Sequence, residues 1–515
     1  MKFLHRPHFP YLFALCMPVT VYAHNQSAFA VRDVLRPILL ALLATVCLVW
    51  LLRRLVPDRV LAGLFASVPV VAMWLVGFDW PLYLILALLS VTIVAARGKA
   101  LSVRLSPLLN ALAAGLLILP VSLIVQVEWS TRLSPSSAIS YSPFVELRGR
   151  TIIGVKPDVY HIVLDAYAGQ DALASELGFD NSEFFAKLRR LGFVVGDSVI
   201  TPYNETLHIM SAVFAGEYLR PNVAPMTSEF APRLRSSLGA WIANGAVHEI
   251  LRSNGYSIAF SDPGHSFLRF PSDASVVRPR GSGSFNMFEN HLGRISRLDS
   301  FFPQAFAEDS VSPLVSTVRY AFSNDYRDID SPKFVYQHVL APHTPFVIDR
   351  HGRYTNSFPG FSSTAEGDAV VHNDPQLRKL YIAGYLEKLR YVNDRVVAQL
   401  EALIAQPNPK VIIVQGDHGS GSKYFANDSE KTCLHERFTT FLAVYSNNER
   451  IRRQLAWVSD PDATPVNLYR SLFNALLDIK LELRPSVSFF VNYDAPHKLE
   501  VLEPDRLRTH CADSA

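Results

Sequence analysis

The sequence predicts two kinds of structure in one chain. An N-terminal all-α transmembrane bundle of about five helices precedes an exported α/β domain with a doubly wound, mostly parallel sheet. Hydrophobic residues form 49% of the 515 residues and are concentrated at the N-terminus, basic residues exceed acidic ones there, and strands alternate with helices in the remainder. This hydrophobicity and only four cysteines exclude a disordered chain and a disulfide-dense secreted scaffold.

Residues 1–130 are predicted to form the transmembrane region. Hydrophobic runs long enough to cross a hydrocarbon core of about 30 Å recur through it. We expect spans near residues 10–23, 34–52, 60–78, 80–96 and 108–127. The first run is short and follows two basic residues, so it is either a retained spanning helix, which we favour, or a signal peptide ending in Val-Tyr-Ala.

The charged residues predict the orientation of these spans. Residues 1–130 hold 10 Lys and Arg against 4 Asp and Glu, whereas the rest of the chain holds 39 against 42. Basic residues in short loops mark the cytoplasmic side. With the N-terminus inside, the outer loops carry only Arg32 and Arg36, so everything after about Ser130 lies on the periplasmic side of the cytoplasmic membrane. The slightly acidic exported part has no basic stripe, which excludes nucleic acid as a partner.

Residues 131–155 are predicted to form a juxtamembrane linker and residues 156–515 the exported domain. Short apolar runs predict strands, and longer amphipathic segments between them predict helices. The expected strands are 158–165, 192–196, 256–260, 334–340, 411–415 and 440–445, and the expected helices are 181–191, 247–253 and 377–405. This alternation is typical of a sheet covered on both faces, which binds ligands outside the carboxyl ends of its strands.

The four cysteines divide between the two regions. Cys16 and Cys47 lie in apolar runs and are expected to pack there as small hydrophobic residues. Cys433 and Cys511 lie on the exported side, where an oxidising compartment permits one disulfide between them. The spacing leaves that pairing open.

Two predicted strands are followed by acidic residues. Asp165 ends Val163-Leu164-Asp165, and Asp417 and His418 end the run that begins at Val411. A lone aspartate after a strand is usually a cap or turn residue, so Asp165 alone is a weak signal. An adjacent carboxylate and imidazole after an apolar strand form either a tight turn or part of a metal site.

Two further segments carry reactive side chains. Thr206 begins a helical pattern, where backbone N–H groups and the helix dipole favour an anion. It is either an N-cap residue or a nucleophile whose alkoxide is stabilised by the dipole and a bound cation. His338 and His343 lie at the end of a strand and on the proline-containing loop that follows. A pair of histidines there fits contacts to an anionic group or a proton relay.

In this order, four segments resemble the sulfatase-like branch of the alkaline phosphatase superfamily. They are Leu164-Asp165, Asn204-Glu-Thr206, His338 to His343 and Gly416-Asp417-His418-Gly419. Within that branch the chain is similar to the membrane-anchored phosphoethanolamine transferases, lipoteichoic acid synthases and phosphoglycerol transferases. The resemblance covers the whole arrangement of the chain and implies an alkaline-phosphatase-like fold for the exported domain.

The resemblance also implies a role for each matching residue. Thr206 would be the nucleophile, and one divalent metal would be bound by Asp165, Thr206, Asp417 and His418. The transferring or leaving group would meet His338 and His343, and a basic substrate-binding cluster would include His343, His435 and Arg437. Asp165 is followed by Ala166, where two-metal relatives have a second carboxylate, which favours a single metal. The transferases commonly have Glu in place of Asp165, so the donor head group stays open.

Chemistry narrows the predicted function. A mixed oxygen and imidazole set suits Zn²⁺ or Mn²⁺ better than Ca²⁺. An exported site lacks ATP as a ready donor, which favours a phospholipid or another envelope ester as donor and an envelope glycan or lipid as acceptor. Together with this chemistry, the resemblance implies a membrane-bound, metal-dependent transferase that moves a phosphoglycerol or phosphoethanolamine type of head group through a phospho-Thr206 intermediate.

Two alternatives remain. The first is a sulfate or phosphate ester hydrolase, although the Cys/Ser-x-Pro-x-Arg motif of usual sulfatases is absent from the sequence. The second is a lipid-sensing pseudo-enzyme of the same fold, which predicts that the metal ligands have degraded.

Overall fold

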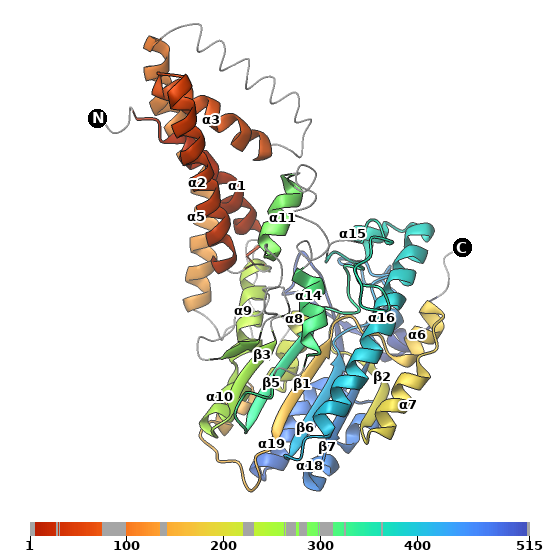
Figure 1. Cartoon of the computed structure of the whole chain (residues 1–515). Coiled ribbons are helices and arrows are strands. Elements are labelled where there is room, and N and C mark those ends of the chain that lie inside the picture. Colours follow the sequence, from red (N-terminus) through yellow and green to blue (C-terminus); the bar gives the residue numbers. More distant parts are fainter. Residues whose placement is uncertain are drawn as a thin grey trace. The chain divides into compact units, whose positions relative to one another are not determined.

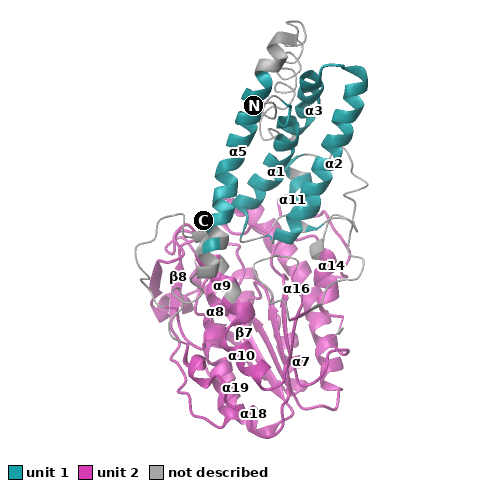
Figure 2. Cartoon of the chain, turned by 90° about the vertical axis from the view of Figure 1, so that its left-hand side faces the viewer, with its two compact units in different colours: residues 1–133, 282–313 teal, residues 134–281, 314–515 magenta. Residues whose placement is uncertain are grey.

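The chain forms two compact units, which Figure 2 distinguishes by colour. The computed structural model describes residues 6–26, 29, 31–74, 99–133, 142–219, 231–261, 263, 274–277, 286–296, 298, 313–323, 326–361 and 364–511. Unit 1 comprises Met1–Leu133 and Ser282–Pro313, and unit 2 comprises Ser134–Gly281 and Leu314–Ala515. Residues 282–313 therefore group with the N-terminal helices, whereas the sequence predicted one continuous exported domain over 156–515.

The described part of unit 1 is mainly helical. Its described helices are α1 (Phe9–His24), α2 (Val31–Leu55), α3 (Arg59–Trp74), α5 (Lys99–Leu133) and α11 (Met287–Ile295). Among the described residues, two stretches are long and apolar enough to cross a membrane, namely Val31–Leu55 and Leu105–Gln126, and α1 and α3 are shorter apolar helices. The expected span over 80–96, like residues 75–78, lies outside the described residues.

Contacts within unit 1 follow from its few polar side chains and its many apolar ones. Asn110 of α5 accepts hydrogen bonds from the backbone N–H groups of His8 and Phe9 at 2.9 and 2.7 Å, which satisfies donors at the first turn of α1. Only 17% of the most apolar 18-residue segment of α2 is buried, and such exposure of apolar side chains suits a lipid environment better than water. Phe288 of α11 packs edge-on against Phe29 with ring centroids 5.1 Å apart.

Unit 2 contains the mostly parallel sheet that the sequence predicted (Figure 1). The strand order is β2-β7-β6-β1-β5-β3-β4, and β7 runs antiparallel to its neighbours β6 and β2 while the other pairs are parallel. The strands are β1 (Asp158–Leu164), β2 (Val194–Ile200), β3 (Ser257–Ser261), β4 (Ser275–Val277), β5 (Lys333–Val339), β6 (Lys410–Gly416) and β7 (Thr439–Ser446). A second sheet pairs β8 (Ser488–Val491) with β9 (Leu499–Leu502).

Helices cover both faces of the large sheet. The described helices that follow β1, apart from α11, are α6 (Gln170–Leu177), α7 (Ser182–Arg190), α8 (Thr206–Ala215), α9 (Ala231–Asn244), α10 (Ala246–Ser253), α14 (Pro313–Ala321), α15 (Asp368–Val371), α16 (Pro375–Ile404), α17 (Leu434–Phe438), α18 (Glu449–Gln454), α19 (Leu468–Leu477) and α20 (Pro504–Arg508). Alternate residues of each strand point to opposite faces. Val159 and Val163 of β1 pack with α8, α9, α10 and α19, whereas Tyr160 and Ile162 pack with α6, α7, α14 and α16. This double burial explains why β1 and β6 are almost continuously apolar.

Candidate active site

Two carboxylates and an imidazole converge where β1 and β6 end. Leu164 of β1 lies opposite Gly416 of β6 in the parallel register, so Asp165 and Asp417 leave the same edge of the sheet. His418 follows, and its Nε2 lies 3.6 Å from Asp165 Oδ1 and 3.7 Å from Asp417 Oδ2. All three side chains are buried. The two strand ends that the sequence singled out therefore form one cluster.

The lone pairs of this cluster are free to hold a cation. Asp165 Oδ1 is buried and has no hydrogen-bond partner among the described residues. His418 Nδ1 donates to the Gly419 carbonyl at 2.8 Å, so its Nε2 lacks a proton in the neutral ring. Asp417 Oδ1 accepts from the N–H groups of Ala166 and His418 at 2.9 and 2.8 Å, which turns Oδ2 toward the cluster. Buried acceptors without donors are costly unless a cation compensates them, so these residues fit a divalent metal.

Thr206 is the fourth member of the cluster. It is the first residue of α8, which confirms the predicted position at a helix N-terminus. Its Oγ1 donates to Asp417 Oδ2 at 2.7 Å and lies 3.4 Å from His418 Nε2. The preceding Glu205 makes no side-chain capping bond to α8. The hydroxyl therefore lies where the helix dipole favours negative charge on its oxygen.

Close packing explains the glycines around Asp417 and His418. A Cβ on Gly419 would overlap the carbonyl of Glu436, and a Cβ on Gly416 would overlap the carbonyl of Tyr167. Ala166, next to Asp165, has a positive φ of 61°, a conformation that costs a non-glycine residue about 1–3 kcal/mol. Its N–H group donates to Asp417, so this backbone turn links the two strand ends.

The two predicted histidines lie on the Asp165 side of the cluster. His338, in β5, places its Nε2 3.1 Å from Asp165 Oδ2 and its Nδ1 3.1 Å from the hydroxyl of Tyr336. His343 donates its backbone N–H to the Asp165 carbonyl at 3.0 Å, and its Nε2 lies 3.4 Å from Glu366 Oε2. Burial alone would lower the pKa of His343, but the carboxylates of Asp165 and Glu366 outweigh it and raise that pKa to about 9.

Arg437 contacts the backbone two residues before Thr206. Its Nε and Nη2 donate to the Asn204 carbonyl at 3.0 and 2.7 Å, and Nη2 lies 2.7 Å from Glu366 Oε1. The guanidinium carbon lies 4.0 Å from the centroid of the Tyr424 ring. Nη1 is buried and has no hydrogen-bond partner among the described residues. The Nη1 group of Arg437 is thus available to donate to an anion, while the rest of the guanidinium is held by Asn204, two residues before Thr206, and by Glu366.

The sequence analysis missed Glu366 and Lys388. Glu366 joins His343 to Arg437, and although burial raises the pKa of its carboxyl, these two cations hold that pKa well below its usual range. Lys388, on α16, donates to the carbonyls of Leu340, His343 and Pro345 at 2.8, 2.6 and 3.2 Å. Burial lowers the pKa of Lys388 to about 7, opposed by the Asp165 charge. Glu366 carries no motif, and Lys388 has the usual pattern of an exposed helical lysine.

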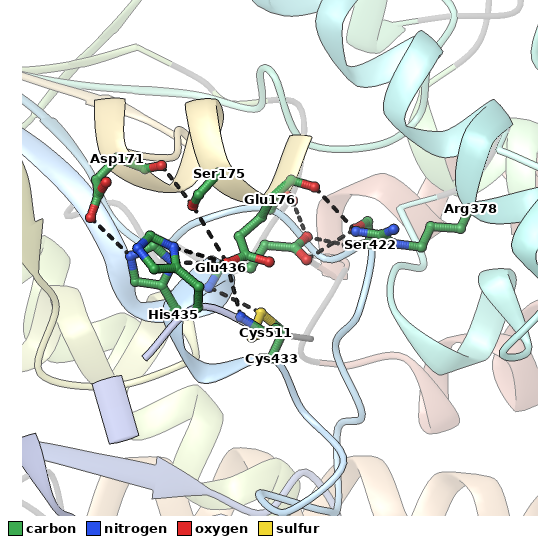
Figure 3. Close-up of a disulfide and its surroundings, with 11 residues drawn as sticks. Asp171, Ser175, Glu176, Arg378, Ser422, Cys433, His435, Glu436 and Cys511 are labelled. Atoms are coloured by element: carbon green, nitrogen blue, oxygen red, sulfur yellow. Dashed lines mark hydrogen bonds and ion pairs between the residues drawn. A yellow bond between two sulfur atoms is a disulfide. The ribbon is translucent and has the colours of Figure 1, made fainter. Parts of the chain in front are cut away.

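The structure places His435 among other partners (Figure 3). Its Nδ1 lies 3.1 Å from Glu176 Oε1 and its Nε2 3.2 Å from Asp171 Oδ2. His435 therefore contacts the carboxylates of α6, while Arg437, on the same short helix, contacts Glu366. The structure also joins Cys433 to Cys511, with Cα atoms 5.7 Å apart, and thereby decides the pairing that the sequence left open.

Comparison with known proteins gives one sequence match and several distant structural ones. The family model described as Sulfatase matches residues 159–479, more than half of the chain. No curated protein matches the chain significantly.

Three solved structures illustrate the structural likeness. One is the integral membrane protein lipooligosaccharide phosphoethanolamine transferase A (EptA) from Neisseria meningitidis, at 11% identity over 92% of this chain and 84% of that one, with a TM-score of 0.39. The C-terminal periplasmic domain of EcEptC from Escherichia coli, in complex with Zn, has 12% identity over 69% and 95%, with a TM-score of 0.43. The lipoteichoic acid synthase LtaP from Listeria monocytogenes has 10% identity over 68% and 83%, with a TM-score of 0.34.

Proposed function

Because the chain belongs to the sulfatase family, we propose that it is a membrane-bound, metal-dependent transferase that moves a phospho head group to a cell-envelope acceptor through a phosphorylated Thr206. The observation that carries this proposal is the Thr206 hydroxyl, 2.7 Å from Asp417 at a helix N-terminus and beside an unpartnered Asp165 oxygen. The proposed location is the cytoplasmic membrane, with unit 2 on the outer side.

The metal would be held by Asp165, Thr206, Asp417 and His418. Three oxygen ligands and one imidazole nitrogen suit Zn²⁺ or Mn²⁺. When bound, such a cation would stabilise the threonine alkoxide and the negative charge on the phosphoryl oxygens.

In the proposed first half-reaction, Thr206 Oγ attacks the phosphorus of the donor and its proton passes to Asp417 Oδ2. A bond forms between Oγ and phosphorus, and the bond from phosphorus to the leaving oxygen breaks. His343, whose Nε2 lies 3.4 Å from Glu366 Oε2, would supply a proton to that oxygen. In the second half-reaction an acceptor hydroxyl attacks the phosphorus and passes its proton to His343. The bond from phosphorus to Thr206 Oγ breaks, and Asp417 returns a proton to that oxygen.

The remaining side chains would bind and orient. The free Nη1 of Arg437 would donate to a phosphoryl oxygen, because the other guanidinium nitrogens are already held by Asn204 and Glu366. His338 contacts the Asp165 carboxylate, so we assign it to positioning that ligand instead of to the leaving group. We leave His435 out of the substrate-binding cluster.

The donor we propose is a phospholipid, since an exported enzyme with apolar spanning helices has membrane lipid as its nearest phosphate ester. The acceptor would be a hydroxyl of an envelope glycan or lipid. Both phosphoethanolamine and phosphoglycerol remain candidate head groups.

Release of diacylglycerol from vesicles tests this proposal. The purified full-length protein is mixed with vesicles of phosphatidylethanolamine or phosphatidylglycerol, with and without a sugar acceptor. We expect release from one of the two lipids, loss of release after chelation, and an increase when acceptor is added. The Thr206→Ala variant should lose about 10³-fold or more of the rate, whereas the exposed control Thr509→Ala should keep it.

Contradictory outcomes are distinct. A rate of diacylglycerol release that does not increase with acceptor would identify a hydrolase. An unchanged rate in Thr206→Ala would exclude Thr206 as the nucleophile. A protein that binds lipid vesicles but releases nothing would support the lipid-sensing alternative.

A further inference from the structure

We propose that Glu176, His435 and His510 form a second metal site, for Zn²⁺, distinct from the Thr206 cluster. Glu176 is on α6, His435 on α17, and His510 follows α20 near the C-terminus. Figure 3 shows the Glu176 carboxylate and the His435 imidazole close together beside the Cys433–Cys511 disulfide. None of the three residues takes part in the transfer reaction proposed above.

The spacing of the three ligand atoms fits zinc. His435 Nδ1 lies 3.1 Å and His510 Nδ1 3.6 Å from Glu176 Oε1, and each of the three residues offers a ligand atom within 4.8 Å of those of the other two. In a tetrahedral site with zinc–ligand bonds of about 2.0–2.1 Å, neighbouring ligand atoms are about 3.3 Å apart. The two measured distances lie on either side of this value, so a cation fits between the side chains with small rotations.

Asp171 contacts the ring nitrogen of His435 that faces away from Glu176, as carboxylates often do beside metal-bound histidines. His435 Nδ1 and Nε2 lie 3.1 Å from Glu176 Oε1 and 3.2 Å from Asp171 Oδ2, so once zinc replaces the proton on Nδ1, Asp171 would hold the remaining ring proton on Nε2. A histidine that ligates a metal usually donates its other ring N–H group to a carboxylate or carbonyl. Asp171 therefore supplies a contact that an isolated ion pair between His435 and Glu176 does not need.

The disulfide brings the third ligand into place. Cys433 stands two residues before His435, and Cys511 directly follows His510. The Cys511 backbone N–H donates to Glu176 Oε1 at 3.1 Å, and the rings of His435 and His510 have centroids 4.6 Å apart. The bond thus holds a C-terminal histidine against two side chains from distant parts of the sequence.

The donor set predicts the kind of metal. One carboxylate and two imidazoles suit zinc better than Ca²⁺ or Mg²⁺, which prefer oxygen alone. Both nearby sulfurs are in the disulfide, so no thiolate is available. The His510 side chain is 58% exposed, which leaves a path for the ion and room for a water as the fourth ligand.

Zinc content of the full-length protein tests this site separately from the Thr206 cluster. Protein in detergent is stripped with a chelator, loaded with ZnCl₂ alone, and analysed by mass spectrometry for zinc. We expect about two ions per chain in the wild type, about one in Asp417→Asn, and none in Asp417→Asn with His510→Gln. The matched control, Asp417→Asn with His351→Gln, changes an exposed histidine elsewhere and should retain about one ion.

Thermal unfolding gives a second readout. Zinc should raise the unfolding midpoint of Asp417→Asn and leave that of Asp417→Asn with His510→Gln unchanged, because a ligand stabilises only the fold that binds it. Intact mass under non-reducing conditions verifies that the disulfide persists in both variants. Equal zinc content in these two variants would overturn the second site. If Asp417→Asn instead holds as much zinc as the wild type while His510→Gln alone loses one ion, the second site stands and the proposed Thr206 metal site fails.

Discussion

Arg437 is a buried side chain with several fixed contacts and one unpartnered donor. Three of its contacts, to Asn204, Glu366 and Tyr424, fix the guanidinium plane and leave Nη1 as the remaining donor. A lysine has one charged nitrogen and cannot make both sets of contacts. The chemistry of this position therefore depends on the fork of the guanidinium as well as on its charge.

We predict that Arg437→Lys lowers kcat/KM by about 10–100-fold, mainly through KM, because a charge-assisted hydrogen bond contributes about 1.5–3 kcal/mol. Head-group release at varied donor concentration measures this split. The control Arg452→Lys, on the exposed side of α18, should leave both constants unchanged. An unchanged KM in Arg437→Lys would remove Arg437 from substrate binding.

Lys388 acts on the site through the loop that carries His343. Replacing it by Met leaves the carbonyls of Leu340, His343 and Pro345 without their donor. We predict a fall in kcat of about tenfold or more with zinc content unchanged, because small misplacements of a catalytic group are costly. The exposed Lys379→Met, on the same helix, is the control. A variant with normal kcat would show that the loop keeps its geometry without this lysine.

Among the elements, the strands with a clear hydrophobic pattern were predicted correctly from the sequence. The expected strands over 158–165 and 411–415 match β1 and β6, since buried parallel strands are short and continuously apolar. Because the parallel neighbours β1 and β6 end at the same edge of the sheet, Asp165 and Asp417 lie close together, as their positions after the two strands suggested. Their roles as metal ligands remain a prediction.

The hydrophobic pattern did not predict which side chains meet when long-range packing brings them together. α17 spans five residues, and its two basic side chains contact different partners, which no spacing rule separates. Glu366 lies outside every strand and helix, so only the folded loop brings it between His343 and Arg437. α11 likewise carries no sequence signal for packing against Phe29 in unit 1.

The disulfide is the element-scale feature with the clearest stability effect. It closes a loop with a sequence separation of 78 residues, for which loop-closure entropy predicts about 4 kcal/mol of stabilisation. Cys511→Ser should therefore lower the thermal unfolding midpoint by several degrees in metal-free protein. Cys47→Ser, at a free cysteine of α2, should not change it. Equal midpoints would show that the C-terminal segment contributes little to the fold.

For the whole molecule, the net charge of +3 conceals an uneven distribution. The basic excess of residues 1–130 predicts topology, and the slightly acidic remainder contains the family match. The sequence thereby predicted the fold class and the family, both of which are confirmed. It gave no indication that residues 282–313 belong with the N-terminal helices, because that grouping is a matter of long-range packing.

Labelling with a membrane-impermeant maleimide tests the topology. In a Cys16→Ser, Cys47→Ser background with the Cys433–Cys511 disulfide intact, single cysteines are placed at Pro57, between α2 and α3, and at Asn356, in unit 2. We expect Asn356→Cys to react in intact spheroplasts and Pro57→Cys to react only after the membrane is opened. The reverse pattern would contradict the orientation deduced from the charges.

The central claim is that Thr206 receives the phospho group, and the mass of the protein after reaction tests it most directly. Full-length protein incubated with donor vesicles and no acceptor, then quenched in acid, is analysed intact and by peptide mapping. We predict an adduct of phosphoethanolamine or phosphoglycerol on the peptide that contains Thr206, present in Thr206→Ser and absent in Thr206→Ala. An adduct on another residue, a sulfate on Thr206, or turnover without any adduct on Thr206 would contradict the account.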